Sequence, residues 1–161
     1  MPAPVTLTGL FGAPVEAFAN LLANVAAFHT FTGTASAILA KQRIYSILEA
    51  ESGVTRPLAL LTYQGGDWSS ERDSASSGNA SFKRDSSLTL LFEKDVTSTG
   101  YTSDAIKTFS NEIGDVIKGI MDKSGTDSLM LVNRITLAGF YSGKEGEEKI
   151  LYAEFKITWG I

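Results

Sequence analysis

The sequence predicts an α+β fold: an antiparallel sheet of about four strands, two or three helices packed mainly on one face, and a C-terminal β-hairpin. Apolar residues recur at spacings of three and four in residues 103–124, which indicates an amphipathic helix. Apolar and polar residues alternate in 87–93 and 148–159, which indicates half-buried strands. The length of 161 residues fits one domain. We place that domain at residues 34–161, after an uncharged helical segment at residues 1–33.

The N-terminal segment is almost free of charge. Glu16 is the only charged side chain before Lys41. Pro14 suits the first turn of a helix, and the apolar spacing predicts a helix over residues 14–28. Its polar side contains Asn and Ala in place of Lys and Glu, so two alternatives remain: packing on its own domain, or docking on a neighbouring subunit. The candidate contact residues are Val15, Phe18, Leu22, Phe28 and Phe31.

Residues 34–64 predict a helix followed by a strand. The helix is expected over Thr34–Glu51, with Thr34 or Ser36 as the N-terminal cap and Gly53 as the left-handed stop. The strand is expected over residues 57–64. It begins at a proline because that residue has no backbone N–H to donate within a sheet.

Residues 65–84 form the longest polar interval and show no apolar periodicity, so a long loop is expected there. Loops longer than about 12–15 residues are uncommon in compact domains unless they bind a partner or are disordered. Large aromatic residues in such a loop need a covering surface. Two alternatives remain, a solvated loop and a partner contact. The candidate contact residues are Trp68, Arg72, Phe82, Lys83 and Arg84.

The C-terminal half predicts the amphipathic helix and a hairpin. The helix begins at Ser103 and ends before Gly125, and the strands cover residues 129–141 and 148–159. Gly114 and Gly119 weaken the helix, so we expect a sheet or another subunit to approach it closely.

The composition excludes most catalytic chemistry. There is no cysteine, and the single histidine, His29, is interpreted as a packed side chain. The carboxylates Asp67, Glu71, Asp73 and Asp85 match no calcium-loop spacing and have basic neighbours. No glycine-rich phosphate loop or serine elbow is present. We therefore expect neither enzymatic activity nor a bound metal or cofactor.

The charge pattern limits the partners. A net charge of −4 disfavours sequence-independent binding of nucleic acid, which requires a clustered positive field, and we expect no specific nucleic-acid partner. No stretch approaches the ~20 apolar residues of a membrane span, and a secretory signal would need positive charge at its start. We expect a soluble, unprocessed protein.

The order helix, strand, long polar interval, strand, amphipathic helix and hairpin resembles the tail terminator (tail completion, head–tail joining) proteins of long-tailed bacteriophages. The resemblance covers residues 34–161. Its most specific parts are residues 37–63 and the terminal strand with Tyr152 and Trp159. It implies a virion structural protein, assembled in the host cytoplasm, that forms a ring of six copies at the head-proximal end of the tail.

The resemblance also implies partners. These are further copies of the chain, the tail tube, the sheath, and neck or connector proteins; DNA would pass through the ring, and no membrane is involved. The family has no catalytic residues to transfer. Two other classes stay open: another phage structural component from the neck, sheath contact or baseplate, and a small ligand-binding domain with a pocket between sheet and helices.

Overall fold

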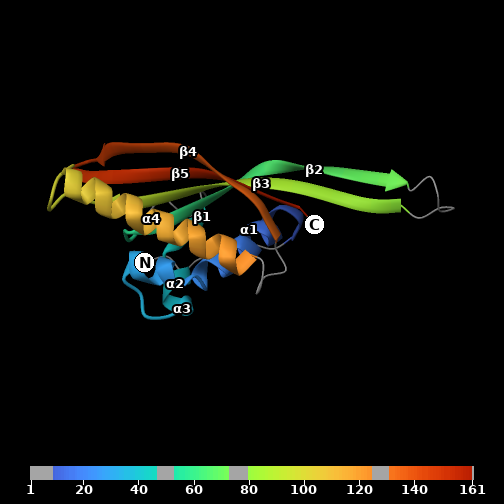
Figure 1. Ribbon diagram of the computed structural model, residues 1–161, viewed down its shortest axis with the longest axis horizontal. Helices are drawn as coiled ribbons and strands as arrows, with labels where there is room; N and C mark the ends of the chain where they lie inside the picture. The colour runs from blue at the N-terminus through green and yellow to red at the C-terminus, as the bar shows by residue number, and fades with distance from the viewer. Residues whose placement is uncertain (1–8, 47–52, 73–79, 125–130, 161) are drawn as a thin grey trace.

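The computed structural model describes residues 9–46, 53–72, 80–124 and 131–160. Within these ranges the chain forms a five-stranded sheet with four helices on one side of it (Figure 1). The helices are α1 (Gly9–Ala23), α2 (Ala26–Thr32), α3 (Ala37–Lys41) and α4 (Ser103–Ser124). The strands are β1 (Ile44–Ser46), β2 (Leu58–Arg72), β3 (Ala80–Asp95), β4 (Leu131–Glu145) and β5 (Glu148–Gly160). The predicted α+β class is confirmed.

The sheet has the order β1-β2-β3-β5-β4, and only the pair β1–β2 is parallel. The sheet is therefore mixed and has five described strands, whereas the sequence predicts about four antiparallel ones. The difference comes from β1, a strand of three residues that joins the edge of the sheet. The predicted C-terminal hairpin is confirmed as β4–β5.

The single helix predicted at 14–28 is wrong, because the chain forms α1 and α2 with a break at Asn24 and Val25. Val25 is extended (φ −80°, ψ 117°) and packs over α4 at Gly119. Pro14 lies inside α1 and not in its first turn. The need to pack Val25 against α4 therefore outweighs continuous helical hydrogen bonding.

The helix predicted at Thr34–Glu51 is also wrong. Among the described residues 34–46, only α3 is helical. It is capped by Ser36, whose Oγ accepts a hydrogen bond from the Leu39 N–H (3.3 Å) as predicted. Ile44 and Tyr45 instead pair with β2 and are 4% and 1% exposed. Because strand pairing buries both side chains, tertiary contacts override the local helical pattern. Residues 47–51 lie outside the described ranges.

The long loop predicted at residues 65–84 is wrong as well. The strand predicted at 57–64 continues through Arg72, and residues 65–72 pair with residues 80–87 of β3, past a register shift between Tyr63 and Gly65. This pairing lies mostly beyond the end of β5, where the core does not impose an alternating apolar pattern. Residues 73–79 lie outside the described ranges.

The predicted amphipathic helix is confirmed as α4, which buries Phe109, Ile113, Val116 and Ile120. The first C-terminal strand extends past the predicted residue 141 to Glu145, and the second begins at Glu148 as predicted and ends at Gly160. Residues 129 and 130 lie outside the described ranges. The reversal is therefore shorter than the expected 142–147, with Gly146 at φ 60°. A left-handed backbone conformation at that position favours glycine.

The core lies between the sheet and the helices, and residues on both sides of position 33 contribute to it. Phe18 and Phe28 from the N-terminal helices are fully buried with Phe92 of β3 and Phe109 of α4. The Phe31 ring meets Phe92 edge to face, with centroids 5.7 Å apart. The N-terminal helices and the sheet are therefore packed into one hydrophobic core.

Candidate functional site

A two-stranded ribbon projects from one end of the sheet. Asp85 of β3 pairs with Gly160 near the end of β5, and beyond that pair the described partner of β3 is β2 alone. Figure 1 shows this ribbon extending past the four described helices. The interval for which the sequence left open a solvated loop or a partner contact thus forms an extension of the sheet, built from two paired strands.

The register places four of the five candidate residues of this interval on one face of the ribbon. Trp68 is opposite Arg84, and Ser70 is opposite Phe82. Positions along a strand alternate between the two faces, and directly paired positions share a face. Positions 68, 72, 82 and 84 therefore lie on the same face, which combines two aromatic with two basic residues.

Lys83, the fifth candidate, takes a position on the opposite face. The same alternation places Asp67, Glu71 and Asp85 on that face. It therefore has three acidic positions and one basic position. The ribbon has faces of opposite charge.

The two faces continue the two sides of the sheet. Ser86, two positions after Arg84, pairs with Trp159, a core residue that is 1% exposed. The aromatic and basic face is therefore continuous with the side that carries the helices. The acidic face is continuous with the outer side of the sheet.

The candidate contact residues of the N-terminal segment lie in the core of this chain. Their exposed fractions range from 0 to 5%. The structure therefore corresponds to the first alternative, a segment that packs on its own domain. The five residues are Val15, Phe18, Leu22, Phe28 and Phe31.

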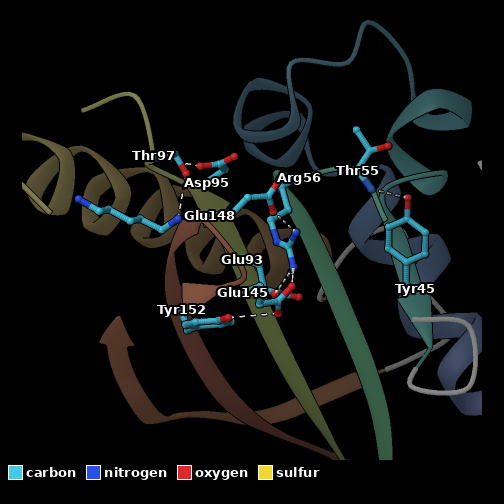
Figure 2. A network of polar contacts seen from close by, with 10 residues as sticks. Tyr45, Thr55, Arg56, Glu93, Asp95, Thr97, Glu145, Glu148 and Tyr152 are labelled. Carbon is cyan, nitrogen blue, oxygen red and sulfur yellow. Dashed lines mark hydrogen bonds and ion pairs between the residues drawn. The ribbon is translucent and has the colours of Figure 1, made fainter. Parts of the chain in front are cut away.

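A polar network that the sequence analysis did not identify lies at the other end of the sheet (Figure 2). Its centre is Arg56, whose side chain is 9% exposed. Nη2 of Arg56 is 3.2 Å from Oε1 of Glu93 and also contacts Glu145, and Nη1 is 3.1 Å from Oε2 of Glu148. One guanidinium thus binds three carboxylates, which ties the segment before β2 to β3 and to the β4–β5 turn.

Burial shapes the acid–base behaviour of this network. It raises the pKa of Glu93, and the opposing effect of Arg56 is smaller. Burial lowers the pKa of Arg56, but its contacts with Glu93 and Glu145 outweigh burial and leave that pKa raised. Burial, together with the charge of Glu145, raises the pKa of Tyr152 to about 12, so Tyr152 remains a hydrogen-bond donor to Glu145 (3.3 Å).

An aromatic pair borders the network. The rings of Tyr141 and Tyr152 are stacked, with centroids 5.0 Å apart, and Tyr141 is 45% exposed. Both residues lie on the outer side of the sheet, because Tyr152 pairs with Glu93 and not with a core position. This end of the sheet therefore presents carboxylates and an aromatic surface together.

A cavity of about 600 Å³ lies where β3 ends and α4 begins. Lys94 and Asp95 line it with Thr99 and Asp104. The Nζ of Lys94 is 2.8 Å from a carboxylate oxygen of Glu112, so this cation is already paired. The other charged residues that line the cavity are the acidic Asp95 and Asp104.

Among the candidate catalytic and metal-binding residues, the structure describes the side chain of His29, and Asp73 lies outside the described ranges. Nε2 of His29 lies 2.6 Å from the carbonyl oxygen of Ala23, so the ring bridges the break between α1 and α2. This contact agrees with the expected packed histidine. In the part of the chain that the structure describes, no three His, Cys, Asp or Glu residues come together as metal ligands.

Comparison with models of known protein families gives no match, and comparison with curated proteins gives none either. Among the described helices, none combines the length and the apolar character needed to cross a membrane.

Proposed function

We propose that this chain is a virion structural protein that forms a ring at the head-proximal end of a phage tail. The resemblance implies that this ring contains six copies of the chain. The ring ends the tail tube and joins it to the neck. The observation that carries the proposal is the ribbon formed by β2 and β3. It extends beyond the described helices and places Trp68 and Phe82 at positions on one face with Arg72 and Arg84.

Such a projection favours assembly. Trp and Arg are enriched among the residues that contribute most to binding at protein interfaces. An isolated two-stranded ribbon is marginally stable in water, so contact with a second surface would stabilise it. The element order after Thr34 agrees with the resemblance in part, because β1 stands between α3 and β2 and the polar interval is largely formed by paired strands.

The charge of the chain fits the same role. A ring around DNA must let a polyanion pass, and basic side chains along the passage would retain it. The chain has 18 acidic and 14 basic residues. Its net acidity is therefore compatible with a passage for DNA.

The proposal is tested by mixing the purified chain with tail tubes and imaging the mixture by negative stain. A ring at one end of the tube supports a terminator. A ring elsewhere in the particle would indicate a neck, sheath-contact or baseplate protein. A monomer that leaves the tubes bare contradicts the proposal and favours the small ligand-binding domain.

A further inference from the structure

We infer that the aromatic and basic face of the ribbon in one copy binds the acidic β4–β5 end of the next copy. The inference rests on the proposed ring and names the two surfaces that form its interface. The binding partner is thus a second copy of this chain. Three relations between the two surfaces support it.

The two surfaces have complementary chemistry. At the β4–β5 end, Glu93, Glu145 and Glu148 share the single guanidinium of Arg56, and the last two side chains are 51% and 52% exposed. Glu147 in the turn is exposed as well. The basic residues beside the turn are Lys144 and Lys149. The Nζ of Lys149 lies 5.8 Å from the ring centroid of Tyr101. The turn and its network thus contain four carboxylates against three cations.

The ribbon face has basic and aromatic positions that complement the acidic β4–β5 end. It has Arg72 and Arg84 at positions beside Trp68 and Phe82, and the register places no acidic residue on that face. Opposite charges across an interface steer association and fix the register of the partners. The exposed ring of Tyr141 provides an aromatic surface for an aromatic partner.

The two surfaces lie at opposite ends of the sheet. The ribbon is formed by the paired segments 68–72 and 80–84, whereas the β4–β5 turn lies beside the far end of β3, where Asp95 pairs with Ile150. Figure 1 shows the ribbon and this turn at opposite ends of the long axis. A contact between opposite ends of identical chains is heterologous, and it generates a closed ring or an open filament.

The two surfaces also lie on opposite sides of the sheet. The ribbon face continues the helix side, whereas Glu93, Tyr141 and Tyr152 take positions on the outer side. A copy that is shifted along the long axis, without being turned over, therefore brings one surface onto the other. Each copy can overlap the next in the same orientation, which a repeating head-to-tail assembly requires.

The absence of cysteine permits a direct test by cross-linking. One preparation carries Arg84→Cys, a second carries Glu147→Cys, and the two are mixed and oxidised. The matched control replaces the first preparation with Lys83→Cys, because that adjacent position lies on the other face of the ribbon. We expect a cross-linked dimer in the first mixture and no cross-linked dimer in the control mixture. Circular dichroism of each variant checks that it is folded.

Charge reversal provides a second measurement. Arg84→Glu should shift the mass in solution from oligomer to monomer, and combining it with Glu147→Arg in the same chain should restore the oligomer. An oligomer that survives Arg84→Glu, or that cross-links equally from positions 83 and 84, would overturn the inference and leave the proposed ring standing. A filament with the expected cross-link supports the inference and contradicts the ring. A wild-type monomer overturns both.

Discussion

Val25 occupies the space that a side chain at position 119 would need: a Cβ placed on Gly119 would lie 2.5 Å from Cγ1 of Val25. This relationship explains two features of the sequence at once. The helix predicted at 14–28 is interrupted so that Val25 can pack onto α4, and α4 contains a glycine at the contact. The close approach expected from Gly119 is real, but its source is the N-terminal segment of the same chain.

Gly119→Ala should destabilise the protein although alanine favours helices by about 1 kcal/mol. Overpacking a tight contact costs about 1–3 kcal/mol, which leaves a net loss of about 1 kcal/mol. Gly114→Ala is the matched control, because a Cβ there meets nothing within 4 Å, and it should stabilise by up to about 1 kcal/mol. Urea unfolding measures both. Equal effects at the two positions would contradict the contact with Val25.

Arg56→Met should destabilise the protein by about 3 kcal/mol, because it leaves the buried carboxylate of Glu93 without its partner. The double variant with Glu93→Gln should recover most of that loss, since no buried charge then remains. Denaturant unfolding of the two single variants and the double variant measures the coupling. Additive effects would show that the two residues do not act as a pair.

Burial raises the pKa of Glu93 above its ordinary value of 4.5, so the folded chain holds this proton to higher pH than the unfolded chain. The resulting stability is fully present below the unfolded value and is lost as the pH rises through the folded pKa. Glu93→Gln cannot lose a proton. Relative to the wild type, its free energy of unfolding should therefore increase as the pH is raised from about 4 to about 7.

Asp95 on the same strand is the control with the opposite sign. Hydrogen bonds from the side chain and backbone of Thr97 lower the pKa of Asp95, so its stabilising contribution is present above the ordinary value of 3.8 and is lost as the pH falls through the folded pKa. At neutral pH, Asp95→Asn should therefore have a lower free energy of unfolding than the wild type. This difference should shrink as the pH falls into the acid range. Identical pH profiles for the two variants would contradict the assignment of Glu93.

Phe18→Ala and Phe28→Ala should each cost about 3–5 kcal/mol of unfolding free energy, because both side chains are 0% exposed in the core. Ile38→Ala, at a side chain that is 78% exposed, should change it by about 0.5 kcal/mol or less. Thermal unfolding at low protein concentration measures these effects in the isolated chain. A small effect of both phenylalanine variants there would instead favour docking on a neighbouring subunit.

Periodicity in the sequence predicts the elements that the core shapes. The alternation of Leu88, Leu90 and Phe92 and the spacing of α4 both reflect burial on one side, and both predictions are confirmed. The ribbon was predicted as a loop because its outer part lies beyond β5. Packing against the core therefore imposes no alternating apolar pattern on its sequence. β1 was missed because pairing with residues 59–61, distant in the chain, decides its conformation.

The candidate site was predictable in part. The aromatic and basic residues of 65–84 were identified from composition, but only the register shows that Lys83 lies apart from Arg84. The network of Arg56 depends on contacts across 37 to 92 residues of chain. One signal was present in the sequence: Glu93 directly follows the apolar run of residues 90–92, and an acidic residue there requires a partner once buried.

Native mass spectrometry of the chain measures whether it forms the proposed ring. At moderate ionic strength we expect one dominant species with six times the 17.2-kDa mass of the chain, which dissociates as added salt screens the charged contacts. A 17.2-kDa monomer as the dominant species, at the concentrations where rings are sought by negative stain, would contradict the proposed ring.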